Sequence, residues 1–227
     1  KFDPTLSKFL ATMSYWGLML LAILTSLSVF GIETTSFAAV IGAASLAVGL
    51  AFQGTLSHLA SGVMLLIFRP FKVGDVVNIG GVLGKVDEID LFTTKIDTPD
   101  NRRIIVPNSA VFGATIENAT FHPVRRVDVA VGTDYNANLD LVRQTLEGVV
   151  ASFPGLLQDP NRAHAIVLTG LGDSSVNWEV RVWANTGDFA KVKEGLTRAV
   201  KVGLDAAGIA IPFPQRDLHI KSGKLGA

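Results

Sequence analysis

From Ser36 to Pro70 the chain reads SFAAVIGAASLAVGLAFQGTLSHLASGVMLLIFRP. Between Thr34 and Phe68 this segment contains no Asp, Glu, Lys or Arg, and it is long enough to cross a bilayer as a helix. Its first half is crowded with alanine, glycine and serine, and in lipid such small residues let helix backbones approach closely. One neighbouring helix covers only one face, whereas the small residues lie on nearly every face. The pattern therefore predicts a membrane helix that packs against others like it.

Another apolar run precedes this segment, from Phe9 to Ile32, and only Glu33 separates the two runs. It exceeds the roughly 20 residues that a helix needs to cross the hydrocarbon core. A signal peptide fits poorly, because no small-residue cleavage site follows and a second apolar run begins at once. We therefore expect two membrane helices, the first facing lipid with Tyr15 and Trp16 near the membrane interface.

The composition indicates an apolar head and a charge-balanced body. Of the 227 residues, 48% are hydrophobic and 18% charged, with Lys+Arg 20 against Asp+Glu 20. This balance gives no net field that would favour nucleic acid, and the absence of cysteine excludes disulfides and thiolate metal sites. Basic residues flank the two runs at Lys1, Lys8, Arg69 and Lys72, but none lies in the turn between them. By the positive-inside rule, both ends of the chain are expected in the cytoplasm.

A track of residues at helical spacing runs along one face of the second segment: Ala39, Ala43, Leu46, Leu50, Gln53 and Ser57. Leu46 and Leu50 lie about 6 Å apart along the axis, which is one turn. If several copies surround an axis with this track inward, the two leucines form stacked apolar rings, and such rings close a pore by dewetting. The pattern is equally compatible with the core of a packed bundle that conducts nothing. Neither span holds an Asp, Glu, Lys or Arg, which disfavours ion-coupled transport.

The second segment is too long for one straight membrane helix. At about 1.5 Å per residue it would extend about 52 Å, against a hydrocarbon core of about 30 Å. We expect a bend at Gln53-Gly54, because glycine is a weak helix former, and Gly62 is a second possible flex point. Residues 55–68 are amphipathic and are expected to lie along the cytoplasmic interface, and Pro70 ends the helix.

The rest of the chain has two patterns. Residues 71–122 alternate short β-branched runs with turns, which predicts a small barrel. A strand–helix–strand–strand–helix order follows and predicts an α+β layer of ferredoxin-like type. The expected elements span residues 125–131, 139–152, 163–168, 175–183 and 188–207. A last short strand is expected near Leu218–Ile220, and as an exposed edge it would need partners.

Four stretches carry a resemblance to a known family. The segment Gly42–Val86, GAASLAVGLAFQGTLSHLASGVMLLIFRPFKVGDVVNIGGVLGKV, resembles the signature of the mechanosensitive channel of small conductance (MscS) family. So do IIVPNSAVFGATIENAT at Ile104–Thr120, NWEVRVWANTGDF at Asn177–Phe189, and DAAGIAIPFPQRDLHI near the end. The resemblance extends from Phe37 to Ile220. It implies a homoheptamer with a pore-lining last membrane helix above a hollow cytoplasmic cage, an Sm-like barrel, and a closing barrel made of the C-terminal strands.

The resemblance also implies roles for single residues. Leu46 and Leu50 match the two gate leucines. The sites expected to pack neighbouring pore helices are Ala39, Gly42, Ala43, Ala47 and Gly49. The expected hinge residues are Gln53, Gly54 and Gly62. The expected contact that governs gating and inactivation involves His58 and Asn108.

Some features depart from the family pattern. Ser45 stands where glycine is common, and His58 and Ser109 replace an expected Asn and Gly at the contact between helix and barrel. Family members normally carry at least one more membrane helix before Tyr15, so we expect this sequence to be a channel core without its leading helix or helices.

The predicted fold is thus a membrane α-helical part, with its pore helix kinked at a glycine, followed by a cytoplasmic Sm-like β barrel and an α+β ferredoxin-like domain, in a cyclic homo-oligomer. The expected segments are 1–36 for the lipid-facing helix and outer turn, 37–70 for the pore-lining and interfacial helix, 71–122 for the Sm-like domain, 123–212 for the α+β domain, and 213–227 for the C-terminal strand and tail.

The predicted function is a poorly selective ion channel of the inner membrane, opened by membrane tension and releasing solutes during hypo-osmotic shock. Its expected partners are other copies of itself, membrane lipids, and permeating ions and small solutes. We expect no enzymatic activity, nucleic acid, cofactor or metal, and the four histidines show no metal-ligand spacing. Two alternatives remain: a passive membrane scaffold, and a membrane-anchored module whose barrel binds nucleic acid or a nucleotide through Arg102-Arg103 or Arg125-Arg126.

Overall fold

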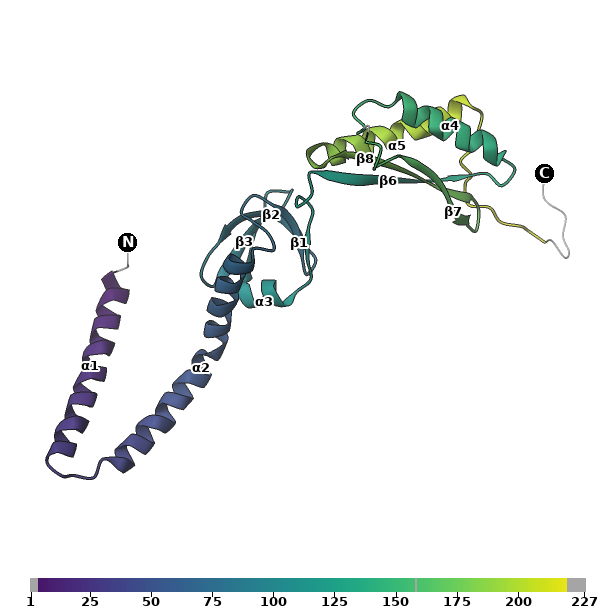
Figure 1. The fold of residues 1–227 in the computed structure, drawn as a ribbon. Coiled ribbons are helices and arrows are strands. Elements are labelled where there is room, and N and C mark those ends of the chain that lie inside the picture. Colours follow the sequence, from purple (N-terminus) through teal and green to yellow (C-terminus); the bar gives the residue numbers. More distant parts are fainter. Residues whose placement is uncertain (1–3, 158, 220–227) are drawn as a thin grey trace. The chain divides into compact units, whose positions relative to one another are not determined.

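The computed structural model describes residues 4–157 and 159–219, and its elements run from two long helices through short strands to a helix-covered sheet (Figure 1). The chain divides into two compact units. One comprises the chain up to Arg69 together with residues 88–95 and 103–114. The other comprises residues 70–87 and 96–102 and the chain from Thr115 onward.

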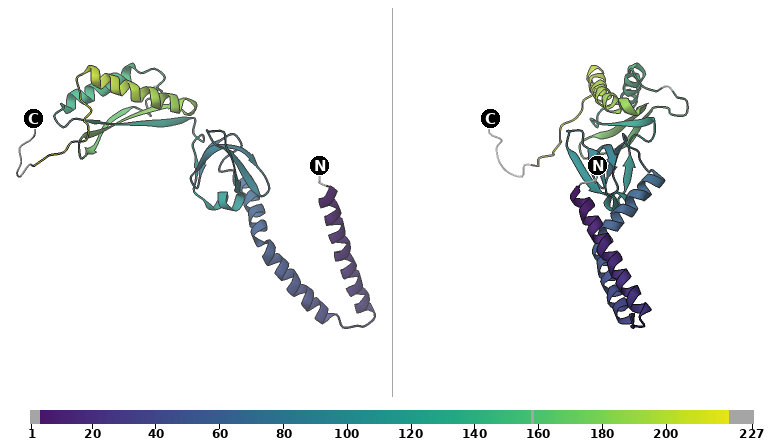
Figure 2. Two further views of the ribbon diagram at one scale, coloured as in Figure 1. Left: turned by 180° about the vertical axis from the view of Figure 1, so that it is seen from behind. Right: turned by 90° about the vertical axis from the view of Figure 1, so that its left-hand side faces the viewer.

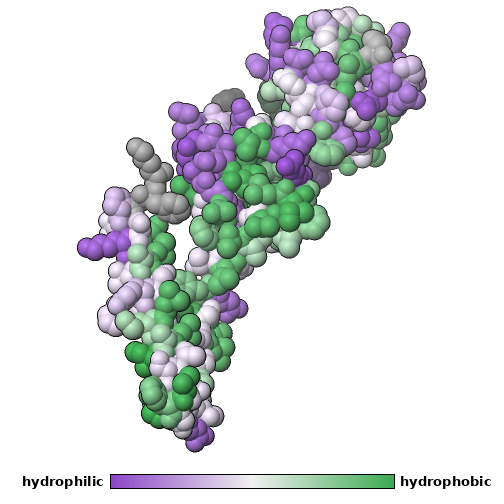
Figure 3. All heavy atoms as spheres, turned by 60° about the vertical axis from the view of Figure 1, so that its left-hand side comes forward, coloured by the Kyte–Doolittle hydropathy of each residue, from purple (hydrophilic) through white to green (hydrophobic). Residues whose placement is uncertain are grey.

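Helices α1 (Pro4–Val29) and α2 (Thr35–Phe68) are the predicted apolar spans. Both are long and apolar enough to cross a membrane, with mean hydropathies of 1.6 and 1.9, and the described chain buries none of their most apolar windows. On the face that Figure 3 shows, hydrophobic side chains cover much of these helices, whereas hydrophilic side chains gather over the C-terminal domain. The apolar surface of α1 and α2 therefore requires a cover that residues 4–157 and 159–219 do not supply.

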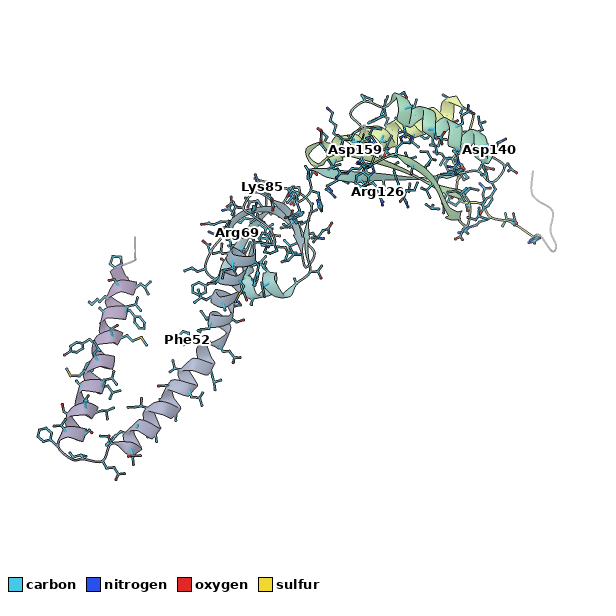
Figure 4. The ribbon with its side chains drawn as sticks, in the orientation of Figure 1. Phe52, Arg69, Lys85, Arg126, Asp140 and Asp159 are labelled. Atoms are coloured by element: carbon cyan, nitrogen blue, oxygen red, sulfur yellow. The ribbon has the colours of Figure 1, made fainter. Side chains whose placement is uncertain are left out.

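Helix α2 remains one α-helix across the expected hinge at Gln53-Gly54. Its axis nevertheless changes direction close to Phe52, and the change is visible from two sides (Figures 2 and 4). Glycine lowers helix propensity by about 1 kcal/mol but keeps its N–H group, so a helix can bend at Gly54 without losing a backbone hydrogen bond. The helix ends before Pro70, where Arg69 takes the left-handed conformation with φ 47° and ψ 56°. A residue that precedes proline disfavours the right-handed helical region, which explains this end.

A sheet of five strands follows α2, in the order β4-β3-β2-β1-β5. The strands are β1 (Val76–Ile79), β2 (Val82–Ile89), β3 (Thr93–Asp97), β4 (Arg103–Pro107) and β5 (Ile116–Asn118). A tight turn joins β1 to β2 through Gly80 and Gly81, whose φ angles of 56° and 91° favour glycine. The short helix α3 (Asn108–Gly113) lies between β4 and β5 and was absent from the sequence prediction, because its six residues are too few for a periodic pattern.

The C-terminal domain has the predicted order of elements. These are β6 (Val124–Thr133), α4 (Leu139–Ser152), β7 (Ala165–Leu171), β8 (Val176–Asn185), a 3-10 turn at Thr186–Asp188, and α5 (Phe189–Ala206). The strands form an antiparallel sheet in the order β6-β8-β7, and the two helices cover one face of it (Figure 1).

Apolar periodicity explains this arrangement. Helix α4 buries Val142, Leu146 and Val150, which are spaced four residues apart and therefore share one face. Strand β8 buries alternate residues from Val176 to Ala184, so one of its faces meets the helices. Trp178 is the largest fully buried side chain, and its indole N–H donates to Thr133 Oγ1 at 3.2 Å.

The predicted C-terminal strand depends on pairing with another segment. Residues 210–219 form neither helix nor strand in the described structure, although a strand was expected near Leu218–Ile220, and Ile220 lies outside the described residues. A strand exists only when a neighbour pairs with it, and this chain offers the segment no partner strand in its described part. Phe213 and Leu218 are both 84% exposed, so the segment leaves apolar side chains uncovered.

Substitution of Gly84 tests the packing of the β-domain. A Cβ at Gly84 would lie 2.5 Å from the Asp97 carbonyl oxygen, so Gly84→Ala should destabilise the domain by about 1–3 kcal/mol through overcrowding. The matched control is Gly148→Ala, because a Cβ at this exposed helical glycine meets nothing within 4 Å. The measurement is thermal unfolding of the detergent-solubilised protein, and equal melting temperatures for both variants would contradict this account.

Candidate pore gate and coupling contact

The predicted gate leucines lie uncovered on α2. Leu46 is 65% exposed and Leu50 is 62% exposed, so the described chain does not use either side chain to fill a core. A Cβ added to Gly42, Gly49 or Gly54 would meet nothing within 4 Å in this chain. The packing inside one subunit therefore gives no reason for these residues to be glycine.

The C-terminal half of α2 is different, because it makes a close contact with the β-domain at Gly62. Gly62 is buried, and a Cβ built there would overlap the Asn108 side-chain nitrogen and lie 2.6 Å from the Leu91 carbonyl oxygen. Two segments far apart in sequence therefore meet Gly62: helix α3, through Asn108, and the turn between β2 and β3, through Leu91. A glycine is required here so that the helix can approach them.

Asn108 is held from several sides. Its side chain is fully buried, its Oδ1 accepts a hydrogen bond from Thr94 Oγ1 at 2.8 Å, and its Nδ2 donates to the Asp90 carbonyl at 2.8 Å. Its backbone N–H donates to the Phe92 carbonyl at 2.9 Å. A buried amide is stable only when its polar atoms are paired, so this network fixes the start of α3 on the β2–β3 turn.

The two departures from the family pattern contact each other. His58 on α2 and Ser109 on α3 form a hydrogen bond, with 2.7 Å between Nδ1 and Oγ. The structure therefore brings His58, Gly62 and Asn108 together as one site, which we call the coupling contact. Its other members are Ser109, Leu91 and the network around Asn108.

An ion pair supports the outer side of the β2–β3 turn. Lys95 Nζ lies 2.6 Å from a Glu88 carboxylate oxygen and 2.9 Å from an Asp90 carboxylate oxygen. The hydrogen bonds that Lys95 donates to these two carboxylates, the one to Glu88 first, raise the pKa of Lys95 above its usual value, so its ammonium stays charged at neutral pH. Asp90 thus binds Lys95 through its carboxylate and Asn108 through its carbonyl.

The remaining predicted residues lie elsewhere. The expected packing residues lie along the N-terminal half of α2, away from the coupling contact: Ala39, Gly42, Ala43, Ala47 and Gly49. Sequence reasoning missed Asp90 and Leu91 in the β2–β3 turn and Thr94 on β3, because neither a turn nor a short strand carries a motif that marks a contact with a helix. Within residues 4–157 and 159–219, no group of three or more His, Asp or Glu side chains is placed to hold a metal ion.

Comparison with known proteins gives consistent matches along the chain. Family models match residues 12–53 (mechanosensitive ion channel, transmembrane helices 2/3), 54–121 (mechanosensitive ion channel, beta-domain) and 127–211 (mechanosensitive ion channel MscS, C-terminal). An uncharacterised MscS family protein from Synechocystis is 39% identical over 96% of this chain and 73% of its own length. A small-conductance mechanosensitive channel from Edwardsiella ictaluri is 44% identical over 96% of this chain and 76% of its own length.

A solved structure agrees with this assignment. The crystal structure of Helicobacter pylori MscS in its closed state superposes with a TM-score of 0.90 at 34% identity, covering 98% of this chain and 88% of that one. Two apolar helices followed by a β-domain and an α+β domain define a membrane channel subunit. The chain belongs to the mechanosensitive channel of small conductance family. Its apolar helices lie in the inner membrane and its later domains in the cytoplasm.

Gly62→Ala tests the coupling contact directly. The added methyl group must displace Asn108 or Leu91, so the seating of α2 on α3 should weaken. We expect the amides of α3 to exchange with solvent about tenfold faster, as measured by hydrogen exchange on the solubilised protein. Gly113→Ala is the control, because a Cβ there meets nothing within 4 Å. Unchanged exchange in Gly62→Ala would refute the contact.

Proposed function

We propose that seven copies of this chain surround one pore lined by α2, and that membrane tension opens this poorly selective channel to release solutes during hypo-osmotic shock. The observation that carries the proposal is the uncovered apolar surface of α2 with its two exposed leucines. Other copies of α2 would cover its small-residue faces, and lipid would cover α1. The test is patch clamp of the purified protein in liposomes under suction. Liposomes that stay electrically silent up to rupture would refute the proposal.

The proposed gate consists of two stacked rings, one of Leu46 and one of Leu50. Both side chains are exposed within the described chain, which leaves them available to line an axis between copies. An apolar constriction of this kind empties of water and stops ions without a physical plug. Once widened, it has no ring of charge or carbonyl groups that would select among ions, which supports low selectivity.

The proposed packing stripe consists of Ala39, Gly42, Ala43, Ala47 and Gly49. Small residues let neighbouring α2 helices lie close together and slide past one another. Tension favours whichever state occupies more membrane area, and it does so through that difference in free energy alone. Tilted and separated helices occupy more area, and their movement would carry Leu46 and Leu50 away from the axis.

The proposed hinge is Gln53-Gly54, with Gly62 as a second flex point. The bend in α2 near Phe52 supports the first position (Figure 4). Gly62 is also constrained by packing, because it lies against Asn108 and Leu91. The coupling contact, including the His58–Ser109 bond, would therefore link movement of the pore helix to the cytoplasmic domains.

The nucleic-acid alternative is not favoured by the comparisons or by the partners of its basic residues. Arg102 is paired with Asp100 at 2.6 Å and Arg126 with Asp128 at 2.7 Å. Arg125 lies over the Phe189 ring, 4.0 Å from its centroid. These partners compete with a phosphate backbone for the same cations. Enzymatic activity has no support in the family, which consists of channels.

Leu50→Ser tests the gate. A hydroxyl in the constriction favours water there, so the channel should open at lower tension or leak at rest. The control is Leu56→Ser, the same change at a position that faces about 120° away from Leu50 around the helix at 3.6 residues per turn. The measurement is the opening threshold in single-channel recordings. A normal threshold for Leu50→Ser, or an equal shift for Leu56→Ser, would contradict the assignment of Leu50.

Gly54→Ala tests the hinge. Alanine raises helix propensity by about 1 kcal/mol, so it should stiffen α2 at the bend and change the decay of current under sustained tension. In recordings at constant suction, a decay and threshold equal to those of the unmodified channel would place the bending elsewhere.

A further inference from the structure

We infer that Thr94 is a positioning residue for gating: its hydroxyl orients the Asn108 amide that seats Gly62 of α2. The inference rests on the proposed function for its consequence in the channel, but its structural part can be measured without any current. Thr94 lies on β3, and no sequence motif marks it as a functional residue.

The first argument is burial. Thr94 and Asn108 are both 0% exposed, in a chain whose described buried polar residues otherwise include only Thr133. A buried hydroxyl or amide without a partner costs free energy, so each group depends on the other. Their hydrogen bond, Thr94 Oγ1 to Asn108 Oδ1 at 2.8 Å, satisfies both.

The second argument is orientation. An amide side chain has a donor end and an acceptor end, and rotation by half a turn exchanges them. The Thr94 hydroxyl binds the acceptor end, which leaves the Nδ2 end to donate to the Asp90 carbonyl at 2.8 Å. That same nitrogen is the atom nearest to the position where Gly62 would carry a Cβ. Thr94 thus determines which end of the amide faces α2.

The third argument is that Thr94 acts through another residue. The three atoms nearest the Gly62 site belong to Asn108 and Leu91, and none belongs to Thr94. The backbone of the same turn also binds the start of α3, since the Phe92 carbonyl accepts from the Asn108 N–H at 2.9 Å. The β2–β3 turn therefore holds the start of α3 in place, and the Thr94 side chain sets the orientation of the Asn108 amide within the coupling contact.

Thr94→Val and Thr94→Ser form a matched pair. Valine has nearly the shape of threonine but no hydroxyl, whereas serine keeps the hydroxyl and loses a methyl group. The chain has no cysteine, so His58→Cys with Ser109→Cys introduces a clean disulfide reporter across the coupling contact. Thr94→Val should slow formation of this disulfide about tenfold, the effect of one lost buried hydrogen bond. Thr94→Ser should stay within about twofold of the parent rate.

The second measurement is current in liposomes at constant suction, without the cysteines. Thr94→Val should change the rate of current decay severalfold and leave single-channel conductance unchanged, and Thr94→Ser should restore the parent decay. In an Asn108→Ala background, Thr94→Val should add nothing, because its effect passes through that amide.

Each contrary outcome overturns the inference. Equal disulfide rates for Thr94→Val and the parent would show that the hydroxyl does not orient the contact. A slowed disulfide with an unchanged decay of current would refute the role in gating. If Thr94→Val does not assemble, Thr94→Ala replaces it, and failure of both to assemble while Thr94→Ser assembles would assign the hydroxyl to folding instead. A silent parent channel would refute the proposed function while the disulfide rates still test the orientation of Asn108.

Discussion

The structure depends on one constraint: α1 and α2 expose apolar side chains that the described part of the chain does not bury. Burial of apolar surface contributes roughly 25 cal/mol per Å², so two helices of 26 and 34 residues cannot remain uncovered in water. Lipid tails cover bulky apolar side chains such as those of α1. The alanines and glycines of α2 gain little from lipid tails and more from close contact with another helix. The membrane location and the proposed oligomer would therefore both meet the need of the same uncovered surface.

The C-terminal half of α2 is held by polar contacts instead. At Gly62 the helix is held by polar groups of a water-soluble domain, and the fit tolerates no additional atom. One helix thus has an apolar half that suits lipid and protein neighbours and a half whose contact is fixed by hydrogen bonds around Asn108. In the proposed channel, α2 would therefore connect a change in the membrane to the cytoplasmic domain.

The sequence was sufficient to predict features that repeat along the chain. The expected bounds of α4, residues 139–152, agree with the structure, because an apolar stripe defines the helix and Asn138 caps it by accepting from the N–H groups of Asp140 and Leu141. The apolar spans and the order of elements in the C-terminal domain were equally readable. Helix α3 was not, since six residues show no period. The packing of Gly62 could not be predicted in detail either, because the path of the strands brings Leu91 next to α2 and Thr94 next to Asn108.

The C-terminal strand expected near Leu218–Ile220 stays a prediction, because a single chain cannot test it. Its residues carry apolar side chains, but a strand is a property of at least two paired segments, and one chain supplies only one. The predicted gate also depends on more than one copy of the chain. The sequence and the subunit place Leu46 and Leu50 on α2, but a ring of leucines needs several copies.

The continuity of α2 through Gly54 has a mechanical consequence. Nucleation of a helical turn costs free energy. A hinge that unfolded and refolded each time the channel opened and closed would therefore be slowed by nucleation. A helix that curves while all its backbone hydrogen bonds persist needs no such step. If Gly54 is the hinge, as proposed, such flexing would be elastic: the helix would return to its resting curvature as soon as the load is removed, and repeated cycles would leave its backbone unaltered.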